Sequence, residues 1–182
     1  MSFEPRTPRP DEATSGAELA LAFTQDAVHV LRRNEGRWRP LGQARFDDPA
    51  MRQVLSALRD DLGGEPLPVR VMIPDDQILY TDVAVDPALP RPQSLIAALE
   101  GLTPYDVADL AWDAAPTAET GKLRVAAVAR QTLTEAEGFA LAHGFVPQGF
   151  GALPGAGRFP HEPDFSADPT ALDAPQDQAL DD

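Results

Sequence analysis

The hydrophobic and polar positions of residues 19–64 predict three strands followed by a helix. Apolar runs separated by polar turns indicate antiparallel strands at residues 19–23, 27–31 and 37–46. Trp38 is expected to point inward from the third strand. Asp47, Asp48 and Pro49 are typical of a helix start, and Gly63-Gly64 of a helix end. Between them, apolar residues recur at helical spacing, at Met51, Val54, Leu55, Leu58 and Leu62.

The second half of the chain alternates strand and helix patterns. Five further strands are predicted, at residues 69–73, 77–85, 109–115, 123–129 and 145–150. One helix is expected after Pro92. Another ends at Gly144, and Thr132 with Glu135 three residues later has the pattern of a capping box at its start. The predicted order is therefore βββαβ followed by βαββαβ, which belongs to the α/β class.

Three antiparallel strands, a crossover helix and a parallel strand resemble the opening of the ribonuclease H-like, actin-like fold. Residues 94–113 have the pattern of a helix ending in Leu102-Thr-Pro-Tyr105, then two acids, then a strand ending in Trp112-Asp113. This segment resembles the cytoplasmic domain of type II secretion protein L and the type IV pilus platform protein M. Residues 122–130, followed by a helix and Gly144, are similar to the next strand and helix of those families. The resemblance covers roughly residues 19–150.

The resemblance implies a half-domain of the actin-like fold followed by an inserted βαββαβ unit at about residues 86–150. It also implies a non-catalytic protein-interaction or scaffold domain of a bacterial envelope secretion or pilus assembly. Such a domain would bind a protein partner in the cytoplasm, at the inner face of the bacterial inner membrane. We therefore expect no catalytic residues, no cofactor and no metal. The alternatives are a degenerate actin-like ATPase and a ribonuclease H-like, metal-dependent nuclease.

Composition and charge set the expected domain boundaries. The 29 acidic residues against 15 Lys and Arg give a formal charge of −14, but residues 159–182 hold seven of the acids and no Lys or Arg. Prolines without apolar periodicity predict a disordered segment at residues 1–18 and a disordered acidic tail at residues 155–182, around a domain at residues 19–154. No stretch approaches the 18 or so apolar residues of a transmembrane helix, and the absence of cysteine excludes disulfides and thiolate sites.

The two enzyme alternatives lack parts of their motifs. The turn after the first strand, residues 23–26, has no glycine through which a backbone could approach phosphates, and Lys122, the single lysine, is not in a phosphate loop. A nuclease would need several carboxylates at strand ends to hold two divalent ions. The candidates for that role are Asp26, Asp75, Asp76 and Asp82. None of the three histidines has a second ligand at metal spacing, and His143 is interpreted as a cation at a helix end.

A local basic patch is the candidate partner-binding site. It consists of Arg32, Arg33, Arg37, Trp38 and Arg39, with Arg45 close by in sequence. Strand alternation is expected to place Arg37 and Arg39 on the face opposite Trp38, where they could meet an acidic partner or an anionic membrane. The alternative is an edge strand that uses charge only to prevent aggregation. The overall charge of −14 disfavours nucleic acid as a partner.

Overall fold

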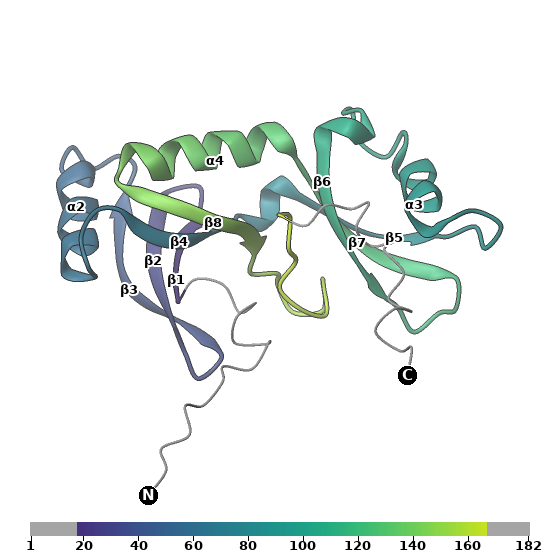
Figure 1. Ribbon diagram of the computed structural model, residues 1–182, viewed down its shortest axis with the longest axis horizontal. Coiled ribbons are helices and arrows are strands. Elements are labelled where there is room, and N and C mark those ends of the chain that lie inside the picture. The colour runs from purple at the N-terminus through teal and green to yellow at the C-terminus, as the bar shows by residue number, and fades with distance from the viewer. Residues whose placement is uncertain (1–17, 167–182) are drawn as a thin grey trace, which may run out of the picture.

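The computed structural model describes residues 18–166 of the 182-residue chain. These residues form a mixed α/β structure with two sheets and three helices, which confirms the predicted class. The two sheets lie side by side, and helix α4 (Arg130–Ala142) begins near the junction between them and runs along the five-stranded sheet (Figure 1). Of the segments predicted to be disordered, 1–18 and 155–182, residues 1–17 and 167–182 lie outside the described residues.

Eight strands and three α-helices make up the described chain. The strands are β1 (Leu19–Phe23), β2 (Ala27–Asn34), β3 (Arg37–Arg45), β4 (Leu67–Ile73), β5 (Ile78–Ala84), β6 (Leu110–Pro116), β7 (Lys122–Ala129) and β8 (Phe145–Ala152). The helices are α2 (Met51–Asp61), α3 (Arg91–Leu99) and α4 (Arg130–Ala142), and short 3-10 turns are η1 (Asp75–Gln77) and η2 (Val107–Asp109). No helix among residues 18–166 is long and apolar enough to cross a membrane.

The larger sheet has five strands in the order β3-β2-β1-β4-β8. Strands β1, β2 and β3 pair antiparallel, whereas β4 runs parallel to both β1 and β8. The sequence predicted an inserted unit at about residues 86–150, but β8 returns to the main sheet and pairs with β4. Helix α4 is the crossover connection that a parallel strand such as β8 needs to reach β4, so α4 and β8 belong to the main sheet. The inserted unit is therefore limited to β5, α3, β6 and β7.

Helices α2 and α4 cover one face of the five-stranded sheet. Leu55 on α2 is fully buried, and Leu58 of the same helix lies against Gly42 of β3, where a side chain would collide with it. Helix α4 buries Leu133 and Ala140. The predicted capping box is absent, because β7 continues directly into α4 and places Ala129, not Thr132, at the N-cap.

The end of α4 also differs from the prediction. His143 is 7% exposed and its ring lies 4.4 Å from the ring of Phe139. Burial lowers the pKa of His143 below its ordinary value, and the nearby charges of Arg52 and Arg59 lower it further. The side chain is therefore a buried neutral group at neutral pH rather than a helix-end cation.

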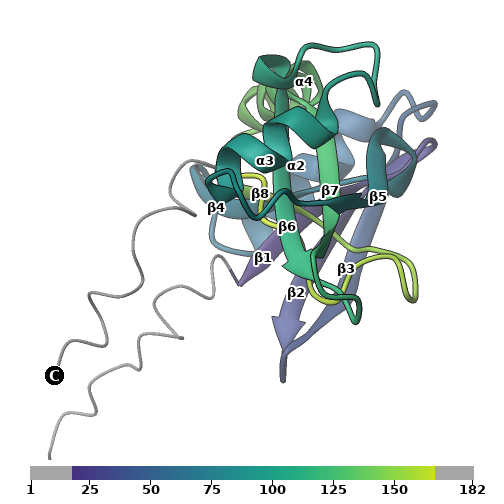
Figure 2. The ribbon, with the colours of Figure 1, turned by 90° about the vertical axis from the view of Figure 1, so that its right-hand side faces the viewer.

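The smaller sheet has three antiparallel strands in the order β5-β7-β6. One face packs against α3, which lies in front of the sheet in Figure 2, and the cluster there includes Leu95, Leu99, Trp112 and Val125. Proline in the first turn of α3 has no amide hydrogen to leave unpaired, as expected at a helix start. The other face of the sheet joins the main core through Ile78, Ala126 and Val128.

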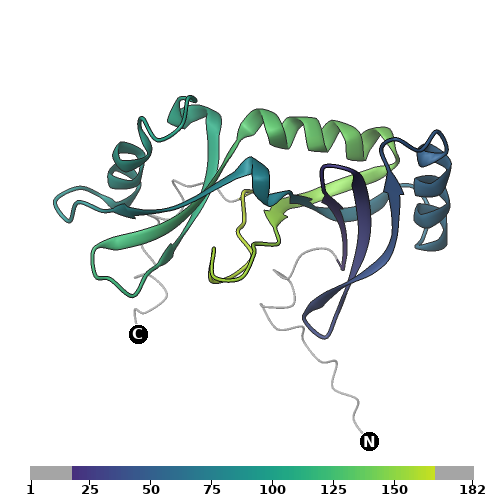
Figure 3. The same cartoon turned by 180° about the vertical axis from the view of Figure 1, so that it is seen from behind.

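After β8 the chain forms an irregular segment of residues 153–166, which we call the strap. It lies at the junction of the two sheets (Figure 3). The sequence predicted disorder from residue 155, but Phe159 and Phe165 are 7% and 3% exposed and belong to the main core. The prediction failed for residues 155–166 because two separated aromatic anchors can order a segment that has no apolar periodicity.

Candidate protein-interaction surface

The β2–β3 hairpin divides the five candidate residues between its two faces. Arg32 lies opposite Arg39 across the two strands, and Arg33 lies opposite Trp38. Because consecutive residues of a strand point to opposite faces, Arg33 and Trp38 share one face, and Arg32, Arg37 and Arg39 share the other. The hairpin thus brings together two groups of side chains instead of one patch of five.

Arg32, Arg37 and Arg39 form the free group, which we call the arginine triad. All three are exposed, and no ion pair joins any of them to an acid within residues 18–166. Arg45, at the other end of β3, is instead paired with Asp47, its Nε 3.0 Å from Oδ1. That hydrogen bond and charge lower the pKa of Asp47 below its ordinary value. The unpaired positive charge of the hairpin therefore lies at its tip.

Arg33 and Trp38 hold a carboxylate from the strap. The Arg33 guanidinium donates to Oε2 of Glu162 at 3.0 Å, and the indole Nε1 of Trp38 donates to Oε1 at 2.7 Å. The Arg33 guanidinium carbon also lies 4.4 Å from the centre of the Trp38 ring. We call these three residues the clasp. Sequence reasoning missed Glu162 because it is 124 residues beyond Trp38 and stands in a segment predicted to be disordered.

Trp38 is half-buried beside a small apolar cluster. Its neighbours in that cluster are Ala20, Leu31 and Met72, on the face of the five-stranded sheet opposite α2 and α4. Trp38 points inward as expected, because it packs against this cluster and the strap partly covers the same face. Trp38 therefore serves as a packing residue and a hydrogen-bond donor within the chain.

The edge position of β3 affects what can bind there. Pro40 and a register shift beside it interrupt the pairing of β2 with β3. Proline, a bulge and arginines are the devices by which edge strands avoid pairing with another strand. A partner of this hairpin would therefore meet side chains rather than add a strand.

The four aspartates of the nuclease alternative are not brought together. Asp76 accepts a hydrogen bond from Gln25 at 2.7 Å, and Asp75 accepts one from the Tyr80 hydroxyl at 2.7 Å. Asp82 is paired with Arg124 on the inserted unit. Asp26 is exposed in the turn after β1. Within residues 18–166 no three His, Cys, Asp or Glu side chains form a group that could hold a metal ion.

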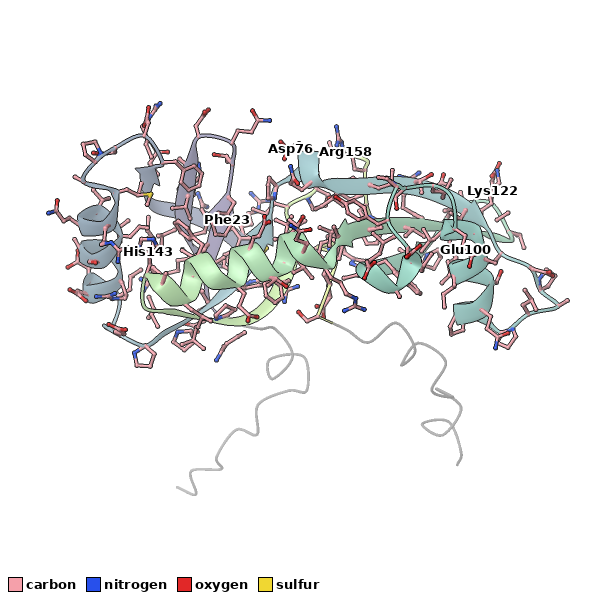
Figure 4. All side chains as sticks on the ribbon, turned by 90° about the horizontal axis from the view of Figure 1, so that it is seen from above. Phe23, Asp76, Glu100, Lys122, His143 and Arg158 are labelled. Carbon is pink, nitrogen blue, oxygen red and sulfur yellow. The ribbon has the colours of Figure 1, made fainter. Side chains whose placement is uncertain are left out.

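A hollow of about 390 Å³ lies beside the turn after β1. Phe23 and Asp76, labelled in Figure 4, lie near this junction of the two sheets. The lining is mainly apolar and includes two carboxylates but no Lys, Arg or His: Ala22, Phe23, Thr24, Gln25, Met72, Ile73, Pro74, Asp75, Asp76 and Leu153. A phosphate group placed there would meet no positive side chain and no glycine-rich backbone, which disfavours nucleotide binding.

Comparisons with known proteins give a likeness of fold. No protein-family model and no curated protein sequence matches the chain. The structure is similar to the cytoplasmic domain of EpsL, an inner membrane component of the type II secretion system of Vibrio cholerae, with a TM-score of 0.53 and 18% identity over 72% of this chain and 55% of that chain. The PilM–PilN type IV pilus biogenesis complex matches with a TM-score of 0.46 and 17% identity over 72% of this chain and 46% of that chain.

The chain thus spans about half the length of the solved structures that it matches. At this level of identity the likeness concerns the fold alone. The resemblance expected from residues 94–113 and 122–130 is confirmed in that sense.

Proposed function

We propose that this chain is a non-catalytic protein-interaction domain of a bacterial envelope secretion or pilus-type assembly. The likeness of fold to the EpsL cytoplasmic domain supports the type of assembly. It also supports an actin-like half-domain that acts at the inner face of the bacterial inner membrane. A fold does not by itself determine a function, so the proposal depends on a particular surface, the arginine triad.

The arginine triad is the observation that carries the proposal. Three exposed guanidinium groups on one face of a hairpin have no acidic partner within residues 18–166, in a chain whose formal charge is −14. Three like charges close together repel one another, and an acidic surface would relieve that repulsion. Arginine also binds carboxylates through two parallel hydrogen bonds. We infer that the partner presents an acidic surface to the tip of the β2–β3 hairpin.

Charge reversal at the triad tests this function. Arg37→Glu together with Arg39→Glu changes the local charge by four units while leaving the clasp intact. A matched control, Arg52→Glu with Lys122→Glu, makes the same change at an exposed arginine on α2 and an exposed lysine at the start of β7. Each tagged chain would be used to recover partners from a native lysate of its source, and the bound proteins would be identified by mass spectrometry.

We expect the wild-type chain and the control to recover the same acidic envelope component, and the triad variant to lose it. Equal recovery by the triad variant would contradict a role for the triad and leave it as an aggregation-resistant edge. Loss of the partner by both variants would show that binding depends on the net charge of the chain and not on the position of the triad.

A further inference from the structure

The strap contacts both sheets. On the five-stranded sheet it is held by the clasp and by Arg70, whose Nη2 donates to the carbonyl of Pro163 at 3.4 Å. On the three-stranded sheet, Arg124 Nη1 donates to the carbonyls of Gly157 and Arg158 at 2.9 and 3.0 Å. The strap is therefore a non-covalent bridge between the main sheet and the inserted unit.

Two further contacts extend the bridge. The backbone N–H of Asp164 donates to Oδ2 of Asp113 on β6 at 3.0 Å. Phe159 packs near Tyr80 of β5, with ring centres 6.3 Å apart. Tyr80 in turn donates its hydroxyl to Asp75. Burial and the Asp75 carboxylate raise the pKa of Tyr80 far above its ordinary value, so the phenol stays protonated and keeps this bond.

The chain itself crosses between the sheets at only two places within residues 18–152. One crossing runs from β4 through η1 to β5, and the other runs from β7 directly into α4. Besides these crossings, the sheets share core packing through Ile78, Ala126 and Val128, so a rotation of the inserted unit relative to the main sheet has to remake that packing. The strap adds a third connection, on the side of the junction away from α4 in Figures 1 and 3.

The strap is held by charged side chains and by its two buried aromatic anchors, Phe159 and Phe165. Arginines from three strands, Arg33, Arg70 and Arg124, hold its carbonyls and its Glu162 carboxylate. The strap has no helix or strand of its own, apart from a single bridge between Gly151 and Asp164. A segment with few backbone hydrogen bonds opens at lower free energy than sheet strands do, and residues 160–164 can open while the aromatic anchors on either side stay buried.

We propose that the strap is a conformational latch. When closed, it fixes the orientation of the three-stranded sheet relative to the five-stranded sheet, and the clasp at Glu162 is its closing point. Opening frees Arg33, Trp38 and Arg70 on the face opposite α2 and α4, and permits rotation of the inserted unit about the two crossings. This inference does not depend on the arginine triad or on any partner.

Spin labels can measure the orientation of the two sheets in the full chain. The sequence has no cysteine, so Gln43→Cys on β3 and Thr120→Cys in the β6–β7 turn, both exposed, give two unique label sites. Pulsed electron paramagnetic resonance would then give the distance distribution between the two sheets. The background variants are wild type, Glu162→Gln, and the control Glu137→Gln, which neutralises an exposed carboxylate on α4.

We expect one narrow distance distribution for the wild-type and Glu137→Gln backgrounds, and a broadened or shifted one for Glu162→Gln. In the Glu162→Gln background, amide hydrogen exchange of residues 158–166 should also be faster than in wild type, by about tenfold or more. The reason is that hydrogen bonds to a charged group are lost. If Glu162→Gln fails to fold, Trp38→Phe removes the indole donor while keeping a ring, and the same changes are expected.

The distance distribution decides the proposal. Superimposable distributions for the clasp variant and wild type would overturn the latch, whether or not the strap amides exchange faster. Faster exchange without a change in distance would make the strap a surface cover that has no effect on the orientation of the sheets.

Discussion

The two faces of the β2–β3 hairpin carry the same kind of residue and have different surroundings. On one face Arg33 and Trp38 are joined to Glu162 and packed beside an apolar cluster. On the other, Arg32, Arg37 and Arg39 are exposed and have no ion pair within residues 18–166. Whether an arginine of this hairpin is paired within the chain or free to bind a partner depends on the face to which its strand position points. It also depends on the distant carboxylate of Glu162. The tests below compare the two faces.

Trp38→Ala should have the largest effect. It removes an aromatic side chain from the cluster with Leu31 and Met72 and leaves Glu162 without its indole donor. We expect a loss of about 2–3 kcal/mol in the free energy of unfolding, the low end for large-to-small changes because Trp38 is half-buried. Arg39→Ala on the opposite face should change it by less than about 0.5 kcal/mol. Urea denaturation of both variants gives the comparison, and equal losses would show that the two faces are alike.

Glu162→Gln should have the next largest effect. It keeps the shape of the side chain but removes the negative charge of the carboxylate to which Arg33 and Trp38 both donate. We expect a loss of about 1–2 kcal/mol in the free energy of unfolding, because both side chains of the ion pair are less than one-third exposed. Glu137→Gln is the control and should be neutral. A stability equal to that of the control would mean that the clasp adds nothing to the folded state.

These stability comparisons belong above pH 7, because the buried His143 changes the stability at lower pH. Its pKa is lowered in the folded chain, so the unfolded chain takes up the proton first as the pH falls. The free energy of unfolding should therefore decrease as the pH drops through about 6.5, the ordinary value for histidine, and level off below the folded-state pKa. Thermal melts from pH 8 to 5.5 would show this slope, which His143→Gln should remove. The exposed His161→Gln should keep it.

Nucleotide should have no effect on the stability of the chain. The lining of the hollow after β1 has no Lys, Arg, His or Gly to hold phosphates, so ATP with magnesium should leave the melting temperature unchanged. A ligand present at 100 times its dissociation constant would add about 2.7 kcal/mol, which a thermal shift detects easily. A saturable rise in melting temperature would favour the degenerate ATPase and contradict the non-catalytic proposal.

Local patterns were sufficient to predict much of the secondary structure. The apolar run at β1, the helical spacing of Leu55 and Leu58, and the glycines that end α2 and α4 all act over a few residues. Gly144 has a φ of 81°, and a side chain there would collide with Arg59, so its position after α4 also has a reason in packing.

Long-range contacts could not be predicted in the same way. The return of β8 to the main sheet depends on pairing with β4, more than 70 residues earlier. The clasp depends on Glu162, and the order of the strap depends on Phe159 and Phe165, which have no periodic pattern. Alternation did place Arg37 and Arg39 on the face opposite Trp38. It did not show that Arg33 is paired, because that requires the position of a distant carboxylate.

The most direct test of the account is the affinity of the recovered partner for three full-length chains at two salt concentrations. The chains are wild type, Arg37→Glu/Arg39→Glu, and Glu162→Gln, measured by isothermal titration calorimetry. We expect the triad variant to bind at least about tenfold more weakly than wild type, and wild-type binding to weaken as salt rises, because exposed charges are screened over about 8 Å at physiological ionic strength. Glu162→Gln should keep at least the wild-type affinity. An unchanged affinity of the triad variant, or loss of binding only in Glu162→Gln, would contradict the assignment of the exposed face to the partner.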